Sequence, residues 1–280
     1  MRQRMGSAGG FSLPKAGQGV ITLVIVHVVA YVLYLLALRA GLDFARDELA
    51  LVPRDVLLRG RIWQPVTSVL IHAPTDVGHL LFNMLMLWWF GGPLEVWWGR
   101  RGLFTAYAVS ALGGVLLTIL AGLAVLPFGP EGSLYYMWTG AHLGASGAVL
   151  GITICWGAAQ WDQRLNFMFL GEMKVKTFVL ILVGIQVLTA LSYDGTSSTS
   201  HFGGILAGWL YGRGWLKPAK LRSWFTQLRH RSTHRRVQAH QAERAKKMAR
   251  FEVIEGGKTD QAGKGTWGRR RDDDDDQIVH

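Results

Sequence analysis

The chain has 280 residues, of which 50% are hydrophobic, and it carries a formal net charge of +11 at pH 7. These two properties belong to different parts of the sequence, because more than half of the 30 Lys and Arg residues follow residue 216. The first part is therefore an apolar body with nearly balanced charge, and the second part is a basic tail. The single cysteine, Cys155, excludes an internal disulfide. The Gly-rich, basic residues 1–18 do not predict a cleavable signal peptide.

Six stretches of the apolar body are hydrophobic enough to cross a bilayer as helices, which takes about 20 mostly apolar residues each. They are residues 20–38, 79–98, 103–126, 143–161, 176–192 and 200–216. The sequence therefore predicts an all-α, polytopic membrane protein. It divides into an N-terminal segment (1–18), a six-helix membrane domain (19–216) and a basic tail (217–280).

The distribution of Lys and Arg predicts the orientation of these spans. Basic residues precede the first span, lie between spans two and three and between spans four and five, and follow span six, whereas 127–142 and 193–199 have none. Six spans place both termini on one side, and the positive-inside rule makes that side the cytoplasm. The loop 39–78 departs from the pattern, but its five arginines are offset by five acidic residues.

Two segments outside the predicted spans are amphipathic. In the first loop, RIWQPVTSVLIHA (61–73) is aromatic and apolar enough to lie in the membrane interface, and a plain solvated loop is the alternative. In the tail, apolar residues recur at helical spacing among basic ones: Leu221, Trp224, Phe225 and Leu228. That pattern is typical of a helix on an anionic membrane surface. Residues 256–280 are expected to be disordered, and no recognition motif supports nucleic-acid binding.

Few polar residues fall inside the predicted spans, and each is a functional candidate because polar groups are costly in lipid. His79 and Asn83 are four residues apart, on one face at the start of the second span. Ser146 lies near the start of the fourth span and His201 near the start of the sixth. The starts of these alternate spans share the non-cytoplasmic side, so the four side chains can meet at one depth. His27, in the first span, has no predicted partner and is interpreted as structural.

Glycines indicate how the fourth and sixth spans meet. They recur every four residues: Gly147 and Gly151 in one, Gly204, Gly208 and Gly212 in the other. Small residues at this spacing let membrane helices approach closely. Because His201 shares a face with these glycines, close packing would bring it beside Ser146. The alternative is that the glycines serve packing alone.

A serine beside a neutral histidine can act as a nucleophile, because the imidazole accepts the hydroxyl proton. Attack on a peptide carbonyl creates an oxyanion, which His79, Asn83 and the backbone N–H of Ser146 can stabilise. No Asp or Glu lies within the middle of a span, which excludes an aspartyl protease and leaves no third member of a triad. The zinc motif HExxH is absent, and Ala148 breaks the GxSxG pattern of soluble hydrolases. The sequence therefore predicts a Ser–His dyad.

Together, HxxxN, GxSG and HxxGxxxG, each opening a predicted span, resemble the rhomboid family of intramembrane serine proteases. The similarity covers about residues 50–215. It implies that Ser146 attacks, that His201 is the base, and that His79 and Asn83 bind the oxyanion. It also implies a first loop half in the membrane and a fifth helix that gates substrate entry. The remaining motif glycines are assigned to the oxyanion turn (Gly144) and to supporting packing (Gly147, Gly204 and Gly208).

The function expected from this resemblance is an intramembrane serine endopeptidase that cleaves transmembrane segments of membrane proteins. It needs no cofactor and no metal. Its expected partners are transmembrane protein substrates and the lipid bilayer, in a bacterial cytoplasmic membrane. One alternative is a non-catalytic, rhomboid-like pseudoprotease that binds membrane clients. A transporter or channel is less well supported, because the chain has no internal repeat.

Several features leave alternatives open. Gln64 stands where the family's first-loop motif has Arg, which puts an anchoring network in doubt, and the loop between His72 and His79 is longer than the common form. Leu150 stands where an aromatic ring often packs on the catalytic histidine. His72 and His142 are candidates for binding water or substrate. A zinc ion held by His72, His79, His142 and His201 is disfavoured, because no carboxylate or thiol joins them.

Overall fold

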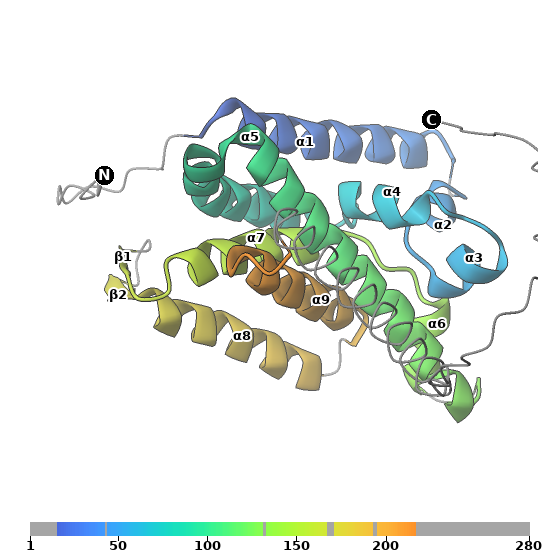
Figure 1. Cartoon of the computed structure of the whole chain (residues 1–280). Helices are drawn as coiled ribbons and strands as arrows, with labels where there is room; N and C mark the ends of the chain where they lie inside the picture. Colours follow the sequence, from blue (N-terminus) through green and yellow to red (C-terminus); the bar gives the residue numbers. More distant parts are fainter. Residues whose placement is uncertain (1–15, 43, 131–132, 167–170, 193–194, 217–280) are drawn as a thin grey trace, which may run out of the picture. The chain divides into compact units, whose positions relative to one another are not determined.

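The computed structural model describes residues 16–42, 44–130, 133–166, 171–192 and 195–216, which are mostly helical as predicted (Figure 1). The long helices are α1 (Gln18–Arg39), α5 (Val77–Ala124), α7 (Ser146–Ala159), α8 (Val175–Leu191) and α9 (Gly195–Gly212), and short helices lie in the connections between them. The predicted surface helix and charged end of the tail, and most of the N-terminal segment, lie outside the described residues.

Helix α1 (Gln18–Arg39) begins against a carboxylate from another helix. The side chain of Glu95 accepts hydrogen bonds from the backbone N–H groups of Gly19, at 2.7 Å, and Val20, at 2.9 Å. The first N–H groups of a helix have no partner within it, and the positive end of the helix dipole favours an anion. Glu95 therefore ties the start of α1 to α5.

The first loop is folded into short helices. It contains the short helices α2 (Phe44–Leu49), α3 (Pro53–Leu58) and α4 (Gln64–Leu70). The indole N–H of Trp63 donates to the carbonyl of Glu48 at 2.8 Å. Asp55 is buried and forms ion pairs with three arginines: Arg54, Arg59 and Arg61.

Gln64 anchors this loop, although the family motif has Arg in its place. Its side chain is fully buried. Its Oε1 accepts from the backbone N–H of Val52 at 3.0 Å, and its Nε2 donates to the carbonyl of Asp47 at 2.9 Å. A neutral amide thus satisfies one buried donor and one acceptor of the loop backbone.

The segment α5 (Val77–Ala124) corresponds to two predicted spans. Gly99 inside it has φ 70° and ψ 172°, which is not helical, so the chain forms two helices that meet there. Only glycine reaches this backbone conformation at little cost. Among the described residues, α1 and the stretch Val77–Phe128 are the helices long and apolar enough to cross a membrane by themselves. Two 3₁₀ turns, η1 (Leu126–Phe128) and η2 (Ser133–Tyr135), and α6 (Tyr136–Thr139) follow α5.

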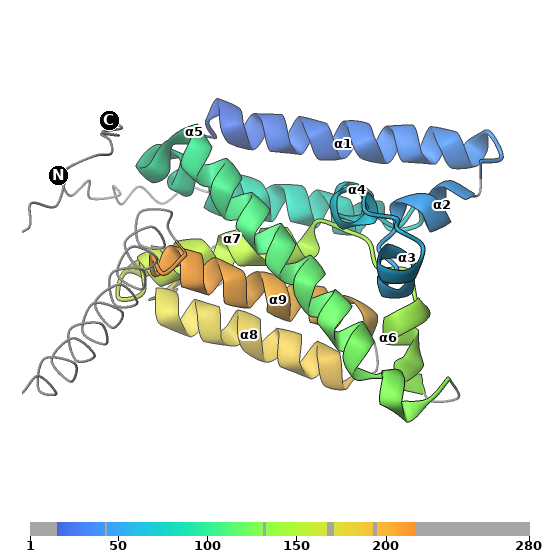
Figure 2. The same cartoon turned by 45° about the vertical axis from the view of Figure 1, so that its right-hand side comes forward.

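The last three long helices are α7 (Ser146–Ala159), α8 (Val175–Leu191) and α9 (Gly195–Gly212). In both views α9 lies between α7 and α8 (Figures 1 and 2). Helix α7 is shorter than the predicted span 143–161. A hairpin that the sequence analysis did not predict joins α7 to α8. Its antiparallel strands are β1 (Arg164–Asn166) and β2 (Glu172–Lys174).

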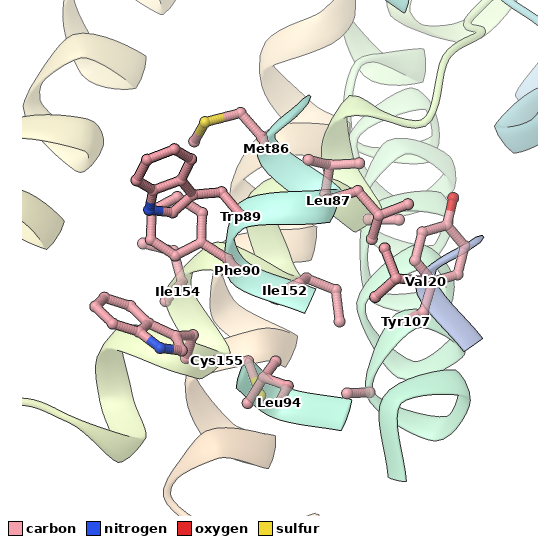
Figure 3. Packing of buried hydrophobic residues seen from close by; sticks show 14 of the residues in the cluster. Val20, Met86, Leu87, Trp89, Phe90, Leu94, Tyr107, Ile152, Ile154 and Cys155 are labelled. Atoms are coloured by element: carbon pink, nitrogen blue, oxygen red, sulfur yellow. The ribbon is translucent and has the colours of Figure 1, made fainter. Parts of the chain in front are cut away.

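The main hydrophobic core lies where α5 packs against α7. Leu87, Phe90 and Leu94 of α5 gather there with Ile152 and Cys155 of α7 (Figure 3). The Phe90 ring also contacts rings of two other helices: Trp156 of α7 at 5.0 Å and Phe178 of α8 at 5.4 Å between centroids. This core fixes α7 along its length and therefore fixes the position at which α7 begins.

Candidate functional site

Helices α7 and α9 touch through their backbones. A Cβ atom at Gly204 would overlap the carbonyl oxygen of Gly147, and one at Gly208 would overlap that of Gly151. A Cβ at Gly147 would lie 2.6 Å from the carbonyl oxygen of Ser200. The close packing predicted from the four-residue glycine spacing is therefore confirmed.

This packing brings together a serine and a histidine that are 55 residues apart in the sequence. The Oγ of Ser146, the first residue of α7, lies 2.7 Å from the Nε2 of His201 on α9. Ser146 is buried and 7% of its surface remains exposed. The hydrogen bond joins the two residues that the sequence pattern predicted to meet.

The second ring nitrogen of His201 has a partner that the sequence analysis missed. Its Nδ1 lies 2.7 Å from the Oε1 of Gln186 on α8. An amide oxygen only accepts hydrogen bonds, so this contact is a hydrogen bond when Nδ1 carries the proton, and the lone pair of Nε2 then faces Ser146. The sequence contains one signal for this residue, because Gln186 is polar and lies within the apolar span predicted at 176–192.

The turn before Ser146 is built on Gly144. Gly144 has φ +121°, in the region that favours glycine, and its N–H donates to the carbonyl of Ser68 at 2.8 Å. A Cβ at Gly144 would lie 3.8 Å from the Oγ of Ser146 and 4.0 Å from the Nε2 of His79. The missing side chain thus leaves space next to both the hydroxyl and a ring nitrogen of His79.

The side chain of His72 connects this turn to α5. Its Nε2 lies 3.1 Å from the Nδ2 of Asn83 and accepts from the backbone N–H of Ala145 at 3.4 Å. Burial lowers the pKa of His72 to about 4, with smaller contributions from the charged forms of His27 and His79. His72 is therefore neutral near pH 7, and its Nε2 accepts both bonds. Sequence reasoning considered His72 as a group for water or substrate, whereas the structure gives it backbone and side-chain partners.

His27 and His142 contact other parts of the fold. His27 accepts a hydrogen bond from the Tyr107 hydroxyl at 2.8 Å and donates to the carbonyl of Leu23 at 2.8 Å, as its structural interpretation requires. His142 is buried, and its backbone pairs with that of Leu51 at 2.8 Å in both directions. Within the described ranges, no three His, Cys, Asp or Glu side chains are grouped to hold a metal ion.

Apolar helices packed through glycines around a serine–histidine pair define a helical membrane protein with a hydrolase-like site. The family model of the Rhomboid domain matches residues 59–218. This match covers more than half of the chain, and the chain belongs to the rhomboid family.

Relatives are found in bacteria and in a plant. Rhomboid protease GlpG of Haemophilus influenzae is 27% identical over 200 residues, which cover 70% of this chain and 91% of that protein. RHOMBOID-like protein 5 of Arabidopsis thaliana is 26% identical over 165 residues, covering 59% of this chain and 48% of the relative. Rhomboid protease GluP of Bacillus subtilis is 24% identical over 195 residues, covering 69% of this chain and 34% of the relative. The chain thus spans about half of the plant relative and about a third of GluP.

Proposed function

We propose that this chain is an intramembrane serine endopeptidase that cleaves transmembrane segments of membrane-protein substrates. The observation that carries the proposal is the 2.7 Å contact between the Oγ of Ser146 and the Nε2 of His201 at the start of α7. The similarity to GlpG and GluP supports it, because both relatives are called rhomboid proteases.

In the proposed reaction, the Oγ of Ser146 attacks the carbonyl carbon of a substrate peptide bond while Nε2 of His201 takes the hydroxyl proton. The tetrahedral intermediate carries a negative oxygen beside the turn at Gly144. His79, Asn83 and the Ser146 backbone N–H are the proposed donors to this oxygen. The imidazolium then gives its proton to the leaving amine as the C–N bond breaks. A water molecule releases the acyl group by the reverse sequence.

The proposed position of the site within the membrane follows from helix length. Helix α7 has 14 residues, which span about 21 Å, whereas the hydrocarbon core of a bilayer is about 30 Å thick. A helix this short begins within the bilayer if its other end lies at the cytoplasmic surface. Ser146 would then sit below the membrane surface, where transmembrane substrates can reach it.

The proposed topology has six spans. They are α1, the two parts of α5 on either side of Gly99, α7, α8 and α9. The distribution of Lys and Arg favours cytoplasmic termini, with the segment 1–18 and the tail 217–280 on that side of a bacterial cytoplasmic membrane. The span region 19–216 forms the membrane domain in this scheme.

The proposed substrates contain a stretch of Gly, Pro or small residues near the outer leaflet. A peptide bond within a helix is shielded, because its carbonyl is hydrogen-bonded and surrounded by side chains, so the segment must unwind before attack. Replacing those small residues with Leu, one at a time, in a model substrate should slow cleavage. Equal cleavage across the series would exclude unwinding as the selection step.

The test of the proposed activity is covalent labelling of the purified protein with a fluorophosphonate probe, first in detergent and then in liposomes. We expect the wild type to be labelled and Ser146→Ala and His201→Ala to remain unlabelled. Labelling that persists in Ser146→Ala would place the reactive group elsewhere. A folded, monodisperse wild type that stays unlabelled in both environments would favour the non-catalytic client-binding alternative.

A further inference from the structure

The amide of Gln186 is a polar group in an apolar helix. The sequence of α8 is VKTFVLILVGIQVLTAL, and Gln186 lies in its second half with the side chain partly buried. An amide that faces lipid without a hydrogen-bond partner is costly. Its Oε1 instead lies 2.7 Å from the Nδ1 of His201, on the side of the ring opposite Ser146. The Gln186 amide therefore has a hydrogen-bond partner in the candidate site and does not face lipid unpaired.

The imidazole of His201 needs a second partner for its proposed role. Neutral imidazole carries one proton, on either nitrogen, and only the form with the proton on Nδ1 can accept the Ser146 proton at Nε2. The contact with Ser146 cannot select this form, because a hydroxyl both donates and accepts. The position four residues after Ser146 is Leu150, so no aromatic ring from that position of α7 packs on the imidazole. A hydrogen-bond acceptor that faces Nδ1 selects the neutral form of the ring with its proton on Nδ1.

We propose that Gln186 is a positioning residue, whose Oε1 accepts the Nδ1–H of His201 and so holds the ring in the form that can deprotonate Ser146. The inference rests on the proposed function, in which His201 is the base. The amide takes the place of the third member of a triad, but it is neutral and orients the ring without adding charge. No atom of Gln186 contacts the substrate in this scheme.

The first test measures the proton position directly. Protein with ¹⁵N-labelled histidine is studied by long-range ¹H–¹⁵N NMR in detergent at pH 7.5, and the His201 signals are identified by their loss in His201→Gln. The wild type should carry the proton on Nδ1. In Gln186→Met, which keeps the length of the side chain and loses the acceptor, we expect a mixture of both forms. The same single form in both proteins, or a wild-type proton on Nε2, would overturn the inference.

The second test measures the consequence for reactivity. Gln186→Met should slow fluorophosphonate labelling about 10- to 100-fold. A positioned general base raises the reaction rate ~10²–10⁴-fold, and a misoriented ring should lose part of that gain. Gln186→Glu keeps an acceptor oxygen and should restore the Nδ1–H form, with labelling within several-fold of the wild type. Thr189→Val is the matched control, because it removes another polar group from α8, a hydroxyl that donates to the carbonyl of Ile185 within the same helix at 2.9 Å.

The two tests separate the inference from the proposed function. Labelling of Gln186→Met at the wild-type rate, with Ser146→Ala inactive, would reject the role of Gln186 and leave the proposed protease intact. An unlabelled wild type would reject the protease, while the NMR spectra would still show whether Gln186 fixes the proton. Equal slowing in Gln186→Met and Thr189→Val would mean that any loss of polarity in α8 disturbs the site, and would also reject the inference.

Discussion

Helices α7 and α8 both contact α9, but they are packed very differently. In α7, 12 of the 14 residues are buried, and its glycine backbone touches that of α9. In α8, the buried residues are Val175, Phe178 and Val179, all in its first two turns. The rest of α8 exposes large apolar side chains, such as Leu188 at 64% and Leu191 at 78%. Helix α8 lies at the edge of the helices in both views (Figures 1 and 2).

This difference separates two properties of the candidate site. The distance between Ser146 and His201 depends on the α7–α9 contact, where backbones meet and no atom can be added. The orientation of the His201 ring depends on Gln186, which lies on the sparsely packed half of α8. Substitutions in the first contact should therefore disturb both folding and reactivity, whereas substitutions on α8 should leave folding nearly unchanged.

The largest effect is expected for Gly204→Val. A Cβ at this position would overlap the Gly147 carbonyl oxygen, so α7 and α9 must separate. Overpacking in a well-packed core costs about 1–3 kcal/mol, and backbone overlap should exceed that range. We expect a lower thermal unfolding temperature in detergent and the loss of fluorophosphonate labelling.

The matched control for Gly204→Val is Leu206→Val, which places the same β-branched residue on the exposed face of α9, where Leu206 is 58% exposed. Its unfolding temperature and labelling should stay near those of the wild type. Comparable losses in the two variants would show that Val destabilises α9 itself, and the importance assigned to the glycine contact would be wrong.

The second largest effect is expected for Gly144→Ala, in the turn before α7. Gly144→Ala places a methyl group in the space next to Ser146 and His79, at a backbone φ of +121° that costs about 1–3 kcal/mol for other residues. We expect labelling to slow about 100-fold, as for the loss of an oxyanion donor. Gly129→Ala is the control, because Gly129 also has positive φ (+78°) but has open space around it. If both variants lost labelling equally, backbone strain alone would explain the result.

A third prediction uses the neutral state of His72. Burial lowers its pKa to about 4, while in the unfolded chain it titrates near 6.5. Between these two values the unfolded state binds more protons, so stability falls as the pH decreases from 6.5 to 4, by at most about 1.4 kcal/mol per pH unit. His72→Gln cannot titrate, and its unfolding temperature should depend less steeply on pH in this window. Parallel curves for the two proteins would contradict the assignment.

The sequence predicted those parts of the molecule that depend on local pattern. Apolar stretches predicted the long helices, and the four-residue glycine spacing predicted the contact that brings Ser146 and His201 together. The exact start of α7 was not predictable, because it depends on the backbone of Gly144 rather than on hydrophobicity. The short helices of the first loop were also missed, since helices of six or seven residues exist only through tertiary contacts such as those of Gln64.

Gln186 illustrates a different limit. Its hydrogen bond to His201 depends on how far α8 is rotated about its own axis, and helix rotation follows from packing against neighbours rather than from the residue's type. In α8 the packing that fixes this rotation comes from Phe178 and Val179, two turns away from the amide. A polar residue in an apolar span could be marked as a candidate from sequence alone, but its partner could not.

The smallest effect is expected for Gly184→Ala, which changes α8 where it has most room. Gly184 lies two residues before Gln186 in the helix, and a Cβ added there meets no atom within 4 Å. Alanine favours the helix over glycine by about 0.5–1 kcal/mol, so the unfolding temperature should stay the same or rise slightly. Labelling should remain within about two-fold of the wild type, because the Gln186 contact is preserved and single surface substitutions change stability little.

Gly184→Ala tests the comparison between α7 and α8 in the loosely packed helix. A loss of stability like that of Gly204→Val would show that α8 is packed as tightly as α9, and the division between distance and orientation would fail. Unchanged stability with slower labelling would instead indicate that α8 bends at Gly184 when the site is in use, because alanine removes backbone freedom without removing any contact. Combining Gly184→Ala with Gln186→Met separates these effects: losses that simply add would assign bending and ring orientation to independent features of one loosely packed helix.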